Sequence, residues 1–155
     1  MSVLEGADGG WVPPFSVGET FTRDVLFDVE TVKAFARLAM DDNPLHHDEA
    51  FARTTRFGGL IASGTHTMAV TTGPVASFLS ERCASLGLQF DYTLRRAIRA
   101  GERATIAWTI DDLSPKASLG GYLVRMTGRL INSTGEDAVI VKGTSLLMPK
   151  SGLQA

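Results

Sequence analysis

Apolar and polar residues alternate over long stretches in the second half of the chain. Apolar side chains occupy every second position from Leu88 to Leu94 and again from Ala104 to Ile110. Two longer runs of the same kind extend over residues 122–131 and 138–148. A period of two is typical of strands that bury one face, so these segments predict four antiparallel strands.

Three short polar segments separate these runs. Residues 132–136, Asn-Ser-Thr-Gly-Glu, have the composition of a hairpin turn between the last two runs. Residues 100–102 join the first two runs, and residues 114–121 are expected to form a looser loop.

The first half of the chain predicts one strand followed by a short helix. Alternation from Phe21 to Val29 favours the strand, and Asp28 is placed to cap a helix whose apolar positions lie three to four residues apart. We expect this helix to reach about Met40. Asn43-Pro44 should end it, because the residue before a proline avoids the helical region.

Two further helical segments follow. The first is a turn from His47 to Arg53, with Asp48 as its cap. The second, from Thr65 to Arg82, carries the apolar positions of a mostly buried central helix. Gly73-Pro74 lies inside it and is expected either to kink it or to start a second segment.

This order of elements predicts an α+β fold in which a curved antiparallel sheet wraps around one long helix. A chain of 155 residues with 44% apolar content suits one domain, which we expect over residues 1–155. Residues 1–17 should form an extended arm, with Trp11 and Phe15 packed onto the body. So small a sheet often pairs with a second copy that covers its exposed face or edge.

Composition narrows the class of protein further. The formal net charge of -2 gives no basic surface for nucleic acid. The apolar runs are too short to span a membrane, and the N-terminus lacks the basic and apolar regions of a signal peptide. Cys83 is the only cysteine, which excludes an intrachain disulfide and fits a reducing compartment, so we expect a cytoplasmic protein.

Candidate chemistry gathers in two segments. Asp41 and His46 lie five residues apart around an Asn-Pro turn, and a carboxylate and an imidazole can share one water as an acid/base pair. Ser63-Gly64 stands at the start of the long helix, where backbone N–H groups favour developing negative charge. An acid/base pair beside a helix N-terminus is what adding water across an activated double bond requires.

The same residues resemble a known family. The segment Asp41-x-Asn43-Pro44-Leu45-His46, followed by Phe57-Gly-Gly-Leu-Ile-Ala-Ser-Gly64, is similar to the MaoC-like (R)-specific enoyl-CoA hydratases and dehydratases, and the resemblance covers roughly residues 16–149. It implies the hot-dog fold, in which a curved sheet wraps around a long central helix.

By position, the resemblance implies that Asp41 and His46 are the catalytic pair and that Asn43 supports them. The backbone N–H of Gly64 would contact the thioester oxygen, and Ser63 and Thr65 would lie at substrate-binding positions. The chain departs from the usual pattern at several places: Ala39-Met40 replaces Ser-Gly, Ser63 stands where many members have His, Thr65 replaces Met or Trp, and Ala97 replaces a proline. These departures leave the pocket shape and the substrate open.

The function implied is reversible hydration of a 2-enoyl thioester to a 3-hydroxyacyl thioester, with coenzyme A or acyl carrier protein as the carrier. No metal or redox cofactor is expected, and the expected assembly is a homodimer or a dimer of dimers. Two alternatives share the fold and the ligand: a hot-dog acyl-CoA thioesterase, in which water attacks the thioester carbonyl, and a non-catalytic module that binds acyl thioesters.

Structural interpretations of the motif residues also stay open. Asp41 or Asn43 could form only an Asx turn before the proline, and Ser63 could act only as a helix N-cap. His66 is expected to face a helix neighbour or a partner subunit. A zinc hydrolase is disfavoured, because the histidines lack a recognised ligand spacing. Three arginines, Arg95, Arg96 and Arg99, could hold coenzyme A phosphates or form an ordinary solvated strand edge.

Overall fold

The structure is a computed structural model that describes residues 10–153. Its strands form one five-stranded sheet in the order β1-β3-β4-β5-β2, with every neighbouring pair antiparallel. The strands are β1 (Thr20–Phe27), β2 (Ala84–Leu94), β3 (Glu102–Lys116), β4 (Gly121–Ile131) and β5 (Asp137–Met148). The four alternating runs of the second half and the strand of the first half are therefore confirmed.

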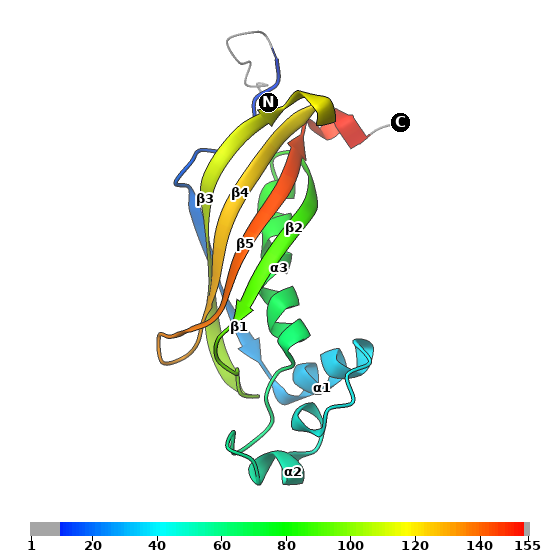
Figure 1. Ribbon diagram of the computed structural model, residues 1–155, viewed down its shortest axis with the longest axis vertical. Helices are drawn as coiled ribbons and strands as arrows, with labels where there is room; N and C mark the ends of the chain where they lie inside the picture. The colour runs from blue at the N-terminus through cyan, green and yellow to red at the C-terminus, as the bar shows by residue number, and fades with distance from the viewer. Residues whose placement is uncertain (1–9, 154–155) are drawn as a thin grey trace.

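The sheet curves along the long helix α3 (Gly64–Ser80), as Figure 1 shows. The apolar residues of alternate positions on the inner face are buried, and they contact the buried side of α3. The core cluster includes Phe27, Val75, Leu79, Ile98, Ala104, Ile106, Trp108, Ile110, Val124, Met126, Leu130, Val139, Val141 and Leu147. A curved sheet wrapped around one helix is the expected hot-dog arrangement, and the predicted α+β class is confirmed.

The short helices lie beyond one end of the sheet, beside the first turn of α3 (Figure 1). They are α1 (Val29–Leu38), the 3-10 helix η1 (Pro44–His46) and α2 (Glu49–Arg53). The predicted caps are present: Asp28 accepts a hydrogen bond from the backbone N–H of Thr31, and Asp48 accepts one from that of Phe51. We call residues 28–63, which contain these helices and lead into α3, the helical overhang.

Helix α1 ends at Leu38, two residues earlier than predicted, and the proline does not end it. Met40 adopts a left-handed conformation with φ of 59°. The N–H of Met40 then donates to the carbonyl of Arg37, and the N–H of Asp41 donates to that of Ala36. This pair of bonds is a Schellman motif, which closes a helix before any proline is needed.

Helix α3 continues through Pro74, so of the two expected outcomes, a kink or a second segment, the second segment does not form. A proline inside a helix removes one backbone bond and crowds the preceding turn. The carbonyl of Thr71 lies in that turn, and it accepts a hydrogen bond from the indole Nε1 of Trp108 at 2.8 Å. Trp108 is itself almost fully buried on β3, so a bond from the sheet supports the helix beside its proline.

Three details of the sheet differ from the sequence-based expectation or go beyond it. Strands β2 and β3, which are adjacent in the sequence, do not pair, because β2 pairs with β5 at the opposite side of the sheet. Strand β3 extends to Lys116, so much of the expected loop is strand. Leu88 is 51% exposed despite its place in the alternation, because the β2–β5 register shifts between Gly87 and Gln89.

The described part of the arm packs onto the body as expected. Trp11 lies edge-on to Tyr122 of β4, and Phe15 is buried against Phe78 of α3. The first nine residues of the expected arm lie outside the described residues. Across residues 10–153, the helices all fall short of the length and apolar character needed to cross a membrane.

Candidate active site

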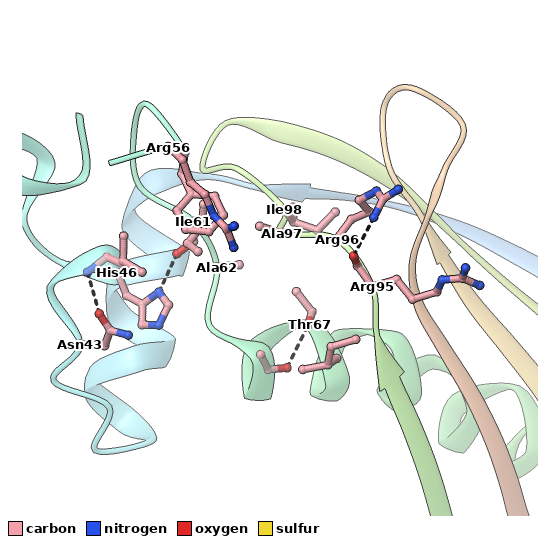
Figure 2. Close-up of a pocket in the computed structure, with 14 residues that line it drawn as sticks. Asn43, His46, Arg56, Ile61, Ala62, Thr67, Arg95, Arg96, Ala97 and Ile98 are labelled. Carbon is pink, nitrogen blue, oxygen red and sulfur yellow. Dashed lines mark hydrogen bonds between the residues drawn. The ribbon is translucent and has the colours of Figure 1, made fainter. Parts of the chain in front are cut away.

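A pocket of about 310 Å³ opens where the helical overhang meets the start of α3 and the end of β2 (Figure 2). One wall comes from the 43–46 segment and the loop that follows α2, and the opposite wall comes from residues 94–98. The lining residues are Asn43, Leu45, His46, Arg56, Phe57, Ile61, Ala62, Gly64, Thr67, Leu94, Arg95, Arg96, Ala97 and Ile98. Three predicted site residues, Asn43, His46 and Gly64, are therefore brought to one cavity.

The imidazole of His46 is buried and held by one backbone contact. Its Nδ1 lies 2.8 Å from the carbonyl oxygen of Ile61, drawn as a dashed line in Figure 2. A carbonyl can only accept a hydrogen bond, so Nδ1 carries the hydrogen. In the neutral ring, Nε2 is then left with a lone pair. Because the contact fixes the tautomer, Nε2 is the ring atom that can take up a proton.

The carboxylate of Asp41 faces that lone pair. Its Oδ2 lies 3.4 Å from His46 Nε2, while its Oδ1 accepts a hydrogen bond from the backbone N–H of Asn43. The Asp41 side chain is 34% exposed and does not line the pocket directly. Asp41 Oδ2 and His46 Nε2 can therefore each accept a hydrogen bond from the same water molecule. If Nε2 is protonated, it can instead donate a hydrogen bond directly to Oδ2.

The structural interpretation of these residues is also correct. Asp41 Oδ1 bonds the N–H two residues on, as in an Asx turn, and Asn43 Oδ1 accepts from the N–H of Leu45 to cap η1. His47 contributes as well, because its Nε2 lies 2.6 Å from the carbonyl oxygen of Asp41. The turn therefore fixes the backbone on both sides of Asp41 and leaves its Oδ2 directed at His46.

The start of α3 supplies the second predicted feature. Ser63 is fully buried and caps the helix by accepting from the N–H of His66, so its structural role is confirmed. Gly64 is the first residue of α3 and lines the pocket, and its N–H has no acceptor within the helix. A Cβ added at Gly64 would lie 2.8 Å from Cδ1 of Leu94, so glycine leaves this part of the pocket open.

Ser63 and Thr65 do not line the pocket. Their hydroxyl groups lie 3.2 Å from each other, and Ser63 is turned into the protein. Contact of either side chain with a ligand stays a prediction.

His66 points into the core and away from the pocket lining. Its ring stacks on Phe35 of α1 with centroids 4.5 Å apart and meets Phe27 edge-on, which places it against a helix neighbour as expected. Its Nδ1 is buried without a hydrogen-bond partner among the described residues. Burial lowers the pKa of His66 below its usual 6.5, with His46 acting in the same direction and Asp28 opposing.

Sequence reasoning missed part of the pocket. Arg56 directly precedes the motif that begins at Phe57, yet nothing in the local sequence placed its side chain at the pocket. Leu94 was assigned only to a strand. Of the three arginines proposed for phosphate contacts, Arg95 and Arg96 line the pocket and Arg99 does not.

Within residues 10–153, no three or more His, Cys, Asp or Glu side chains come together as a metal site would require. The one cysteine, Cys83, is buried, and burial raises the pKa of its thiol to about 11.

Comparisons with known proteins address the family. A family model described as "MaoC like domain" matches residues 15–93, just over half of the chain. The chain belongs to the MaoC-like family. The match includes β1, the helical overhang and α3, and thus both segments that carry the candidate chemistry.

Solved structures agree with this MaoC-like assignment. An (R)-hydratase from A. caviae involved in PHA biosynthesis superposes with a TM-score of 0.77 at 25% identity, covering 86% of this chain and 98% of that one. A MaoC-like dehydratase from Rhodospirillum rubrum gives a TM-score of 0.74 at 26% identity, covering 87% and 94%. Among curated sequences, a UPF0336 protein from Parafrankia sp. is 27% identical over 144 residues, 86% of this chain and 91% of the relative.

Proposed function

We propose that this MaoC-like chain reversibly hydrates a 2-enoyl thioester to a 3-hydroxyacyl thioester. The observation that carries the proposal is the 3.4 Å approach of Asp41 Oδ2 to His46 Nε2, beside a pocket that His46 lines together with Gly64, the first residue of α3. The (R)-hydratase and MaoC-like dehydratase similarities support this class of reaction.

In the proposed reaction, one water molecule donates its two hydrogens to Asp41 Oδ2 and His46 Nε2. The water oxygen forms a bond to C3 of the enoyl group, and the pair takes up the proton that this oxygen loses. The electron pair of the C2–C3 double bond moves toward the thioester oxygen to give an enolate. A proton from the same pair then adds to C2, so the net change is the addition of one water.

The enolate oxygen is the site of greatest developing charge. The N–H of Gly64 is proposed to donate to it, because a helix N-terminus presents fixed dipoles that favour negative charge. In comparable oxyanion sites, loss of one donor costs about 3 to 4 kcal/mol of transition-state stabilisation. The buried His46 and the apolar lining of the pocket would limit access of further water to this intermediate.

Assembly as a homodimer is also part of the proposal. Strand β2 is at an edge of the sheet, and Leu86, Leu88 and Leu94 on it are each about half exposed. A second copy paired along this edge would satisfy the free backbone groups and cover the leucines. Because Leu94 also lines the pocket, size-exclusion chromatography with light scattering should accompany the activity assay.

The test is an absorbance assay for loss of a 2-enoyl-CoA, run across a panel of chain lengths. Asp41→Asn and His46→Ala should each lower kcat by about 100- to 10,000-fold, the usual range for a proton-transfer group, while circular dichroism stays unchanged. Asp42→Asn is the matched control, because this neighbouring carboxylate is exposed and should leave kcat unchanged. Full hydration by both site variants would refute the assignment.

Thiol release, followed in the same samples, separates the alternative functions. A thioesterase would release free coenzyme A in step with turnover, whereas the proposed hydratase would not. A non-catalytic module would bind the thioester without consuming the double bond or releasing thiol.

A further inference from the structure

The pocket is cationic although the chain as a whole is not. Three of the residues that line it are arginines, Arg56, Arg95 and Arg96, and none is an aspartate or glutamate. The complete sequence has a formal net charge of -2, so the positive charge of the pocket does not follow from the composition of the chain. The other lining residues are mainly apolar and include Phe57. His46 lines the same cavity.

Two of these arginines have no ion pair with any residue from 10 to 153. They are Arg56 and Arg95, whereas Arg96 Nε lies 3.4 Å from Glu136. The guanidinium of Arg56 lies over the ring of its neighbour Phe57, with the carbon 5.0 Å from the ring centroid. This contact orients the group and leaves its N–H donors free, because it uses the face of the plane and not its edge.

The positions of the three side chains differ. Figure 2 shows Arg56 on the wall formed by the loop after α2, with its guanidinium directed toward the space between the two walls. Arg95 and Arg96 lie on the opposite wall, where the Arg95 side chain extends away from the pocket and Arg96 donates to the Arg95 carbonyl oxygen at 3.2 Å. Arg56 is therefore the arginine without an ion pair among residues 10–153 whose guanidinium is directed into the pocket.

A guanidinium fork matches the oxygens of a phosphate, and an unpaired one favours a dianion over a neutral group. An otherwise mainly apolar pocket with one unpaired guanidinium directed into it fits a ligand that is uncharged along most of its length and anionic at one end. The thioester carriers have this form, since both coenzyme A and acyl carrier protein attach the acyl group through a pantetheine arm that ends in a phosphate.

We propose that Arg56 binds the phosphate of the pantetheine arm and thereby selects phosphorylated thioester substrates. The inference rests on the proposed function, because it assumes that the same pocket holds the thioester. It assigns Arg56 as a carrier-binding residue and predicts that the phosphate, rather than the thioester alone, contributes to affinity.

The experiment compares two probes that differ only in the phosphate, 2-butenoyl-pantetheine and 2-butenoyl-4′-phosphopantetheine. The wild-type protein should hydrate the phosphorylated probe with a kcat/KM about 10-fold higher, a modest value because exposed charges are screened by solvent. Arg56→Gln should remove this preference by raising the KM for the phosphorylated probe, with a much smaller change in kcat/KM for the uncharged probe. Arg56→Lys, which keeps the charge but loses the fork, should retain part of it.

Arg99→Gln is the matched control, because Arg99 lies close in sequence to the second wall but does not line the pocket. It should preserve the wild-type preference for the phosphate. Repeating the comparison with 2-butenoyl-CoA and with a 2-butenoyl carrier protein distinguishes the source of the phosphate. A loss in Arg56→Gln that is confined to one carrier identifies that carrier, and an equal loss on both identifies the phosphate that they share.

Calorimetric binding of coenzyme A to the wild type and to Arg56→Gln gives a readout that does not need turnover. Weaker binding by the variant, together with a lost phosphate preference, would support the inference. An equal effect of Arg56→Gln on both probes, or unchanged binding and unchanged preference, would overturn it. Absence of hydration with every probe while Arg56→Gln still weakens coenzyme A binding would instead refute the proposed hydratase and leave the phosphate site standing.

Discussion

The two walls of the pocket are built in opposite ways. In the 41–48 segment almost every polar side chain is fixed by a hydrogen bond: Asp41 and Asn43 bond to backbone N–H groups, and His46 and His47 bond to backbone carbonyls. On the opposite wall, Leu94 is half exposed and Arg95 has no ion pair in the described chain. The first wall is rigid enough to hold reacting groups in place, whereas the second has side chains free to rearrange around a ligand.

The comparison shows that a structural role and a chemical role can belong to one side chain. Asp41 uses one oxygen to fix the turn and turns the other toward His46. Groups that transfer protons need precise positions, and the turn supplies them without additional residues. A wall that only accommodates an acyl thioester needs shape and charge, for which a few exposed side chains suffice.

Among residues outside the proposed catalytic pair, removing the cap on the rigid wall should give the largest effect. Asn43→Ala deletes the bond to the Leu45 N–H, which should cost about 1 kcal/mol of unfolding free energy. It should also lower kcat/KM for an enoyl-CoA by about 100-fold, because small displacements of reacting groups are expensive. Chemical denaturation and the absorbance assay measure the two effects.

Asp48→Ala is the matched control for that variant. Asp48 caps α2 in the same overhang, so its loss should cost similar stability while activity stays near the wild-type value. Equal activity losses in both variants would mean that the turn around Asn43 has no special connection to the chemistry.

A methyl group at the start of α3 tests the adaptable wall. In Gly64→Ala, the new Cβ would stand 2.8 Å from Leu94 Cδ1, the end of a flexible and half-exposed side chain. Stability should therefore fall by less than about 1 kcal/mol. Activity should fall by about 10-fold, less than the loss of an oxyanion donor, because the methyl hinders the approach of the thioester to the N–H.

Adding Leu94→Ala separates the two effects of that methyl. In the double variant the contact with Leu94 is gone, so the melting temperature should return toward that of Leu94→Ala alone. Activity should stay low, since the methyl still stands beside the N–H. Recovery of kcat/KM in the double variant would show that Leu94, and not the ligand, was what the methyl disturbed.

Local features of both regions could be predicted from the sequence. The caps at Asp28, Asp48 and Ser63 are confirmed, because each depends only on a side chain and an N–H three residues later. The same holds for the alternation in β3, where Ala104 to Ile110 bury one face. Features that depend only on residues close in the sequence can therefore be predicted from the sequence alone.

Three features that depend on distant contacts were not predicted. Alternation does not specify a partner strand, so the pairing of β2 with β5 was not available from the pattern. Pro74 was expected to disturb α3, but the bond from Trp108 to that part of the helix comes from another element. Arg56 reaches the pocket only because the overhang folds back beside residues 94–98.

Substitution of Met40, the strained residue before Asp41, should have a smaller effect and should raise stability instead of lowering it. Met40 has a φ of 59°, and this left-handed conformation costs a non-glycine residue about 1 to 2 kcal/mol. A glycine avoids that cost but loses more chain entropy on folding, which offsets about 0.5 to 1 kcal/mol of the gain. Its side chain is 87% exposed, so little burial is lost on substitution. Met40→Gly should therefore raise the unfolding free energy by roughly 0.5 to 1 kcal/mol, measured by urea denaturation, with unchanged activity.

Met40→Ala provides the comparison for that gain. Alanine keeps a Cβ in the left-handed region, so it should leave stability near the wild-type value. A similar gain from both substitutions would assign the effect to the exposed methionine side chain and not to backbone strain.

The smallest expected effect concerns His66, which is buried in the first turn of α3. Burial lowers its pKa in the folded protein, with His46 adding to the shift and Asp28 opposing it, so the unfolded chain binds a proton more readily. His66 therefore contributes stability above its ordinary pKa of 6.5, and this contribution is lost as the pH falls below that value.

His66→Leu should flatten that pH dependence, because leucine fills a similar space against Phe35 and cannot be protonated. The measurement is the difference in melting temperature between pH 7.5 and pH 5.5, which should be smaller in the variant than in the wild type. The replacement also removes a buried nitrogen that has no partner in the described residues, so the loss of ring stacking is partly offset at neutral pH. An unchanged difference would mean that His66 gains a proton as easily when folded as when unfolded.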